Sequence, residues 1–190
     1  MPPKKGDPLK GRHLLLGVTG SIAAYKAADL VSAVARRGLS VTVLMSPSAQ
    51  AFVGAATFAA LSGRRVVTDL FDPALADIEH IAMTDRADAM MVAPATANAI
   101  AKLACGLADD PVTTTALALK RGAPLIVAPA MNTRMWEHPA TRENLERLSA
   151  RGVRVVQPVE GVLACGTEGW GKLAPVEALV SALEEALSKR

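Results

Sequence analysis

The residues Leu14-Leu-Leu-Gly-Val18, Thr19-Gly-Ser21 and Ile22 to Arg37 decide the fold class of this chain. The first five form an apolar run that is typical of a buried strand, and the glycine-containing turn leads into an alanine-rich segment. Apolar residues recur there at helical spacing until Gly38 stops the helix. A buried strand that passes through a tight turn into a helix is the first half of a βαβ unit.

The same alternation continues to the carboxyl end of the chain. Further strands are predicted at Ser40–Met45, Ala87–Ala93, Leu125–Ala128 and Val153–Gln157, with a short one at Val66-Val67. Helices are predicted from Ser46 to Gly63, after Asn98 to about Gly106, over 112–120, at Thr141–Ala150 and at Val176–Lys189. Residues 69–80 and 158–174 are predicted to be irregular. We therefore expect an α/β fold, a three-layer Rossmann-like (flavodoxin-like) parallel sheet with helices on both faces.

Length and composition limit the class of protein. The chain has 190 residues, of which 51% are hydrophobic, 21% charged and only 3% aromatic. We expect a single domain over 13–190 with an aliphatic core, preceded by a flexible basic leader over 1–12. The net charge of +3 comes largely from the two termini, and the scarcity of aromatic side chains argues against a nucleic-acid partner.

Neither a targeting signal nor a membrane span is predicted. The first 12 residues lack an apolar core, and no apolar run reaches the roughly 18 residues that a span requires. Cys105 and Cys165 lie far apart, and no potential ligands have zinc spacing, so we expect neither a structural disulfide nor a metal site. A cytoplasmic protein is the prediction that follows.

Polar turns follow several of the predicted strands. Gly20 and Ser21 lie between the first strand and its helix, where backbone N–H groups and the helix dipole favour a phosphate. Ser46 ends the second strand, and Thr96-Ala97-Asn98 follows a later one. Each turn can also be an ordinary helix cap, but together they indicate a ligand site at one edge of the sheet. No acidic residue ends the second strand, which favours a mononucleotide over NAD.

Three further residues are candidates for chemistry on a small molecule. Asn132 stands in Pro129-Ala-Met-Asn-Thr-Arg-Met-Trp136, just after a predicted strand, where its carboxamide could hold a small anion. Cys165 lies in a glycine-rich segment and could donate a proton or attack an electrophile; the alternative is a small buried side chain. His80 is the best-placed base, although an isolated histidine is more often a surface or capping residue.

Taken together, these segments resemble the flavin-containing cysteine decarboxylases. The similar segments are Gly17-Val-Thr-Gly-Ser-Ile-Ala-Ala-Tyr-Lys26, His80-Ile81 with Ala87-Asp88, Pro94-Ala-Thr-Ala-Asn98, and Pro129 to Trp136, which fits the family signature P-x-M-N-x-x-M-W at every fixed position. Ala164-Cys-Gly166 is most similar to the branch that acts on 4′-phospho-N-pantothenoylcysteine in coenzyme A biosynthesis. The resemblance covers about residues 13–175 and departs from the family at Arg86, where Trp is common, and at Thr167-Glu168.

The resemblance implies FMN as cofactor and decarboxylation of that substrate to 4′-phosphopantetheine. In that reaction His80 would assist oxidation of the cysteinyl thiol, Asn132 would hold the carboxylate and Cys165 would return a proton. The implied cofactor-binding residues are Gly20, Ser21, Ile22, Ser46, Thr96, Ala97, Asn98 and Ala130, and Met135 would join Asn132 in binding substrate. Homotrimers, or dodecamers of trimers, with the flavin between subunits are also implied, as is a separate or fused synthetase partner.

Two alternative functions stay open. A peptidyl-cysteine decarboxylase of natural-product synthesis would share the Asn132 segment but would stop at the ene-thiol, without need of Cys165. A flavoprotein that serves as a regulatory subunit of a phosphatase would need none of the three candidate residues for catalysis. The sequence is compatible with both a free-standing decarboxylase and the decarboxylase half of a bifunctional protein.

Overall fold

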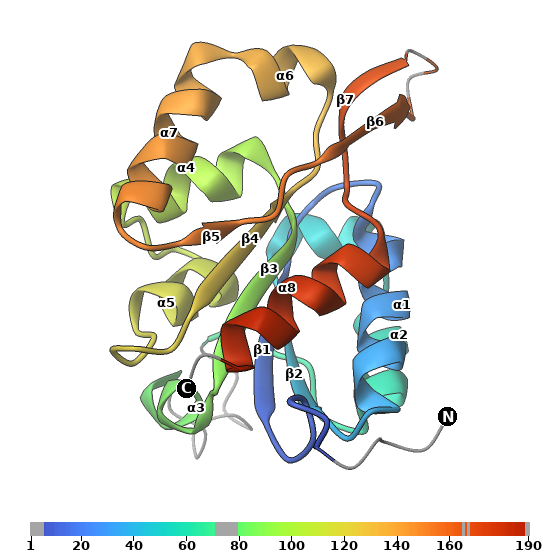
Figure 1. The fold of residues 1–190 in the computed structure, drawn as a ribbon, viewed down its shortest axis with the longest axis vertical. Coiled ribbons are helices and arrows are strands. Elements are labelled where there is room, and N and C mark those ends of the chain that lie inside the picture. The colour runs from blue at the N-terminus through green and yellow to red at the C-terminus, as the bar shows by residue number, and fades with distance from the viewer. Residues whose placement is uncertain (1–5, 71–79, 165, 167, 189–190) are drawn as a thin grey trace.

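A computed structural model describes residues 6–70, 80–164, 166 and 168–188, apart from the side chains of His80 and Ile81. Its central element is a parallel sheet with the strand order β2–β1–β3–β4–β5 (Figure 1). The strands are β1 (His13–Val18), β2 (Ser40–Met45), β3 (Ala89–Ala95), β4 (Leu125–Pro129) and β5 (Arg154–Val155). This strand order is that of the flavodoxin-like doubly wound fold, so the predicted fold class is confirmed.

Helices cover both faces of the sheet (Figure 1). One face carries α1 (Ala24–Ala35), α2 (Ala55–Ser62) and α8 (Val176–Ser188), and the other carries α4 (Ala97–Cys105), α5 (Pro111–Leu117) and α7 (Pro139–Ala150). Shorter helices are the 3₁₀ helix η1 (Pro47–Ala51), α3 (His80–Arg86) and α6 (Thr133–Glu137). The arrangement gives the three layers that the alternation of strands and helices predicts.

The strands read as continuous apolar runs because both of their faces are buried. Leu14 and Leu16 of β1 pack in the core beneath α1 and α8, whereas Leu15 packs beneath α4 and α7. Val43 and Leu44 of β2 divide in the same way. Successive side chains of a strand point to opposite faces of the sheet. A strand that alternated apolar and polar residues would therefore have placed polar side chains in one of the two cores.

Several elements differ from their predicted form. Residues 46–63, predicted as one helix, form η1 and α2, which are separated by the extended backbone of Gly54. His80, predicted in a loop, begins α3. Val67 forms only an isolated bridge with Leu44 rather than a strand. These errors share a cause, since short segments give too few residues to establish a period.

Residues 158–174, predicted to be irregular, contain an antiparallel hairpin of β6 (Val159–Val162) and β7 (Glu168–Lys172). The hairpin stands outside the parallel sheet, at the edge where β4 ends (Figure 1). Gly161, Gly169 and Gly171 occupy its strands. Glycine is generally disfavoured in strands, so the sequence pattern did not predict this hairpin.

Residues 6–12, predicted to belong to a flexible leader, contact the domain. Leu9 is fully buried. Asp7 accepts hydrogen bonds from the Arg37 guanidinium at 2.8 Å, and Arg12 forms an ion pair with Asp88 at the same distance. The folded domain therefore includes residues before His13.

Candidate active site

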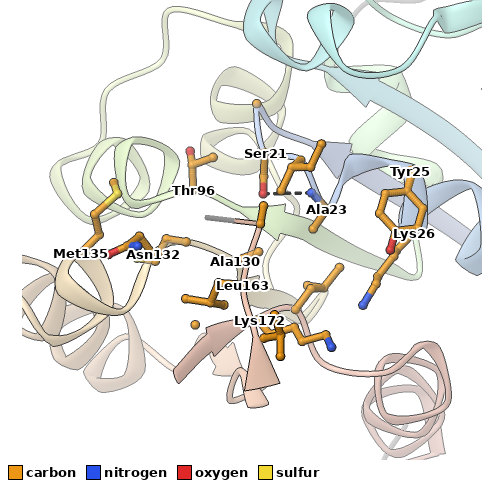
Figure 2. A pocket seen from close by; sticks show the side chains of 17 residues that line it. Ser21, Ala23, Tyr25, Lys26, Thr96, Ala130, Asn132, Met135, Leu163 and Lys172 are labelled. Atoms are coloured by element: carbon orange, nitrogen blue, oxygen red, sulfur yellow. Dashed lines mark hydrogen bonds between the residues drawn. The ribbon is translucent and has the colours of Figure 1, made fainter. Parts of the chain in front are cut away.

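A cavity of about 550 Å³ lies at the carboxyl edge of the sheet. Its walls come from the segments that directly follow β1, β3 and β4, together with the start of α1 and the β6–β7 hairpin (Figure 2). Open parallel sheets bind ligands at this edge, and a cavity of this size suits a cofactor or small substrate.

The turn after β1 presents hydrogen-bond donors to the cavity. Ser21 Oγ accepts the N–H of Ala23 at 3.2 Å, which leaves the hydroxyl hydrogen to donate elsewhere. The backbone N–H groups of Gly20 and Ile22 have no hydrogen-bond partner among the described residues. A Cβ on Gly20 would lie 2.4 Å from Ser48 Oγ, so the turn approaches η1 as closely as only glycine allows. Such a turn fits a phosphate group.

Thr19 holds this turn against the turn after β3. Its hydroxyl donates to the carbonyl of Pro94 at 2.7 Å and accepts the N–H of Thr96 at 3.0 Å. Only 3% of Thr19 is exposed. The sequence reasoning missed this residue, because a threonine in a glycine-containing turn has no pattern that distinguishes a support from a cap.

Only some of the other predicted cofactor-binding residues line the cavity. Ser46 is buried, and its Oγ lies 3.1 Å from that of Ser48, whose exposed hydroxyl is the one that borders Gly20. Thr96 lines the cavity and caps α4 by accepting a backbone N–H. Ala97 and Asn98 are not among the described residues that line the cavity of the single chain, and Asn98 is exposed.

Asn132, Met135 and Ala130 all line the cavity. Asn132 is the N-cap of α6, and its Oδ1 accepts the backbone N–H of Arg134 at 2.9 Å. This hydrogen bond fixes the plane of the carboxamide and makes Nδ2 the donor end of the side chain. A donor held in that way suits a carboxylate ligand.

The β6–β7 hairpin is bound directly to the Asn132 loop. The N–H of Met131 donates to the carbonyl of Gly171 at 2.9 Å, and Thr133 Oγ1 donates to the carbonyl of Trp170 at 2.7 Å. A Cβ on Gly171 would lie 2.2 Å from the Met131 carbonyl oxygen, so the two segments meet backbone to backbone. The turn of the hairpin, with Ala164 on the cavity wall, is thereby held at the site. Cys165 itself lies outside the described residues.

Helix α3, which begins at His80, leads into the amino end of β3. The carbonyl of Asp85 accepts a hydrogen bond from Lys120, in the turn before β4, at 2.6 Å. This is the end of the sheet opposite the cavity (Figure 1). The described part of α3 is therefore remote from Asn132 within one chain, and the side chain of His80 lies outside the described residues.

A charged cluster joins the amino ends of β1, β2 and β3. His13 Nε2 lies 2.9 Å from Thr42 Oγ1, and Asp88 accepts the His13 N–H and the Arg12 guanidinium, each at 2.8 Å. Burial, and then the charge of Arg64, lower the pKa of His13. Burial raises the pKa of Asp88, but its hydrogen bonds with His13 and Arg12 outweigh that effect, and the pKa lies below the usual value. This cluster lies far from the cavity and acts on stability.

The described residues include no group of three or more His, Cys, Asp or Glu side chains that could share a metal ion. None of the helices in the described segments combines the length and apolar character needed to cross a membrane.

Comparison with known proteins identifies the family. The model of the Flavoprotein family matches residues 3–188. The chain belongs to the Flavoprotein family. This Flavoprotein chain is 44% identical to the probable phosphopantothenoylcysteine decarboxylase of Streptococcus mutans, over 93% of the chain and 99% of that protein. It is 47% identical to the coenzyme A biosynthesis bifunctional protein CoaBC of Bacillus subtilis, over 93% of the chain but only 43% of that longer protein.

Solved structures of similar proteins share the fold. The FMN-dependent cysteine decarboxylase SpaF is 33% identical, with a TM-score of 0.80, over 95% of this chain and 98% of that one. A mutant PPC decarboxylase complexed with pantothenoylaminoethenethiol is 30% identical, with a TM-score of 0.81, over 92% of this chain and 97% of that one. The predicted resemblance to flavin-containing cysteine decarboxylases is confirmed.

Proposed function

We propose that this chain is an FMN-dependent decarboxylase that converts 4′-phospho-N-pantothenoylcysteine to 4′-phosphopantetheine in coenzyme A biosynthesis. The observation that carries the proposal is the attachment of the hairpin to the Asn132 loop. Backbone contacts between Met131 and Gly171 hold the Asn132 carboxamide and Ala164, the residue that precedes Cys165 in the sequence, at one cavity. The similarity to a probable phosphopantothenoylcysteine decarboxylase, matched over 99% of its length, supports the same activity.

The cavity fits a flavin mononucleotide. The N–H groups of Gly20 and Ile22, which no described residue accepts, and the Ser21 hydroxyl supply phosphate donors. The remaining wall, including Ala130 and Met131, is largely apolar, as a ring system requires. FMN, when bound, supplies an acceptor for hydride and its later return. The FMN dependence of the similar protein SpaF supports this cofactor.

The residues of the chain divide the remaining work. Asn132 Nδ2 donates a hydrogen bond to the substrate carboxylate and orients the cysteinyl end. His80 serves as the base for the cysteinyl thiol. Removal of a hydride from the cysteinyl end, which bound FMN would accept, makes loss of CO₂ possible and leaves an ene-thiol. Reduction of the ene-thiol to the saturated thiol takes a hydride, which the cofactor would return, and a proton, which Cys165 Sγ would donate to carbon.

A neighbouring subunit supplies His80 in this proposal. The described residues of α3 lie at the opposite end of the sheet from the cavity, which supports a site in which His80 and Asn132 come from different subunits. We propose a homotrimer, or a homododecamer built from trimers, with the flavin between subunits. A cytoplasmic location and a separate or fused synthetase complete the proposal.

Mixed oligomers test this arrangement. His80→Asn and Asn132→Asp should each be inactive with 4′-phospho-N-pantothenoylcysteine, as followed by mass spectrometry. Subunits of the two variants, co-expressed with different tags and co-purified, should regain part of the activity, because some sites then combine an intact His80 with an intact Asn132. Co-purified oligomers with no activity would refute the shared site. Wild-type turnover of a cysteine-terminated peptide, but not of the pantothenoyl substrate, would refute the proposed substrate.

A further inference from the structure

Two lysines line the end of the cavity that is remote from Asn132. Lys26 comes from the first turn of α1, and Lys172 ends β7. Figure 2 shows their ammonium groups directed toward one end of the cavity, whereas Asn132 and Met135 lie at the other. In the part of the chain that the structure describes, neither lysine takes part in an ion pair.

Lys26 stands at a position of α1 that does not favour a cation. A cation near the amino end of a helix opposes the helix dipole, and α1 has no acidic residue in its first turn to offset Lys26. Lys172 adds a second positive charge to the same end. Its Nζ lies 3.5 Å from the place that a Cβ of Gly161 would occupy, so the side chain runs across the neighbouring strand β6. Two ammonium groups at one end of the cavity would attract a dianion.

We propose that Lys26 and Lys172 bind the 4′-phosphate of the substrate. This inference rests on the proposed function. The cavity would then recognise the two ends of an elongated molecule by different chemistry, with a neutral carboxamide for the carboxylate and two ammonium groups for the phosphate dianion. The flavin phosphate would be bound by other donors, the backbone N–H groups and the Ser21 hydroxyl of the turn at Gly20–Ile22.

The experiment compares phosphorylated and dephosphorylated substrate. The variants are Lys26→Met, Lys172→Met, their combination and Lys172→Arg, with Lys10→Met as the control, since Lys10 is exposed and does not line the cavity. For 4′-phospho-N-pantothenoylcysteine we expect kcat/KM to fall roughly 10- to 100-fold in each single Met variant, mainly through KM. The loss for N-pantothenoylcysteine should be at least about tenfold smaller, and Lys172→Arg should restore most of the phosphate preference.

Binding measurements distinguish the substrate phosphate from the flavin phosphate, and they do not depend on catalytic turnover. Calorimetry on flavin-loaded protein should show that 4′-phosphopantothenate binds more tightly than pantothenate, and that the Met variants remove the difference. Equal losses for both substrates, weaker FMN binding alone, or no loss would each overturn the inference. If the wild type turned over neither substrate, the proposed function would fail, while the calorimetric preference would still decide the role of the two lysines.

Discussion

Asn132 combines a structural and a chemical task in one side chain. Its Oδ1 caps α6 through the N–H of Arg134, while its Nδ2 is the donor that the proposed reaction requires. Sequence reasoning predicted the chemical task from the position after β4. The cap is the reason that the donor has a fixed direction, and only the structure reveals it.

Substitutions at Asn132 separate the two tasks. Asn132→Asp keeps a capping oxygen but places a negative charge against the substrate carboxylate, so kcat/KM should fall by roughly 100-fold or more, with stability near that of the wild type. Asn132→Ala should lose activity and also about 1 kcal/mol of unfolding free energy. Steady-state kinetics and urea denaturation provide both readings. An active Asn132→Asp enzyme would contradict the assigned role.

Thr19 offers a second test at the scale of single residues. Thr19→Val removes the hydroxyl that joins the Pro94 carbonyl to the Thr96 N–H in a buried position, and should cost about 1–3 kcal/mol of unfolding free energy. The cavity turn should loosen with it, so FMN should bind more weakly. Thr19→Ser retains the hydroxyl and serves as the control. Equal stability of the two variants in urea denaturation would show that these hydrogen bonds do not hold the turn.

At the scale of elements, the hairpin is the feature that the sequence concealed. Glycines that look like strand breakers occupy β7 because Gly171 meets the Met131 backbone and Gly169 packs against the Thr133 side chain in the Asn132 loop. Local propensity was overridden by a contact between segments far apart in sequence. By contrast, β1 and α1 were predictable. Strand β1 is buried on both faces and therefore reads as a continuous apolar run, whereas α1 is buried along one side and therefore shows apolar residues at helical spacing.

Gly171→Ala tests that contact. The new Cβ would lie 2.2 Å from the Met131 carbonyl oxygen, and a φ of +124° strains any side chain there, so the hairpin should detach and activity should be lost. Gly63→Ala is the matched control, since its φ of +65° is also positive but nothing lies within 4 Å of its Cβ. Hydrogen exchange should rise in β6 and β7 only in Gly171→Ala. Unchanged exchange in that variant would refute the docking account.

The cluster at the amino ends of β1, β2 and β3 predicts an acid-sensitive fold. His13 has a lowered pKa, so the unfolded chain takes up its proton first, and stability falls as the pH drops below about 6.5. Asp88, also with a lowered pKa, adds a further loss as the pH falls below about 4. Urea midpoints at pH 7.5 and 5.5 should differ more in the wild type than in His13→Gln. An identical pH dependence would rule out His13 as the cause.

At the scale of the whole molecule, apolar side chains are exposed around the cavity. Ile22 is 58% exposed, Tyr25 57% and Val162 64%. Such a patch beside a ligand site is typical of a protein interface. We expect a trimer or a larger oligomer by light scattering, and Tyr25→Glu should shift it to smaller species that bind flavin weakly. Leu117→Glu is the control, since Leu117 of α5 is 64% exposed and does not line the cavity. A Tyr25→Glu protein with unchanged assembly and flavin content would contradict this interface.

The whole-molecule organisation was only partly readable from the sequence. The sheet and its layers follow from patterns within single segments, as do the turns at Gly20 and Thr96. The meeting of the Gly171 strand with Met131, and the distance between α3 and the cavity, depend on contacts that no local pattern encodes. Lys26 and Lys172 belong to this second class, since only the folded chain brings them to one end of the cavity.

Anaerobic turnover of 4′-phospho-N-pantothenoylcysteine by flavin-loaded protein shows whether the chain completes a redox-neutral decarboxylation. We expect release of CO₂ and formation of 4′-phosphopantetheine over many turnovers without any added oxidant, because hydride removed from the substrate is returned to it. Cys165→Ser should instead release the ene-thiol. A purified protein that takes up no flavin, that releases no CO₂, or whose Cys165→Ser variant forms the normal saturated product would contradict the account.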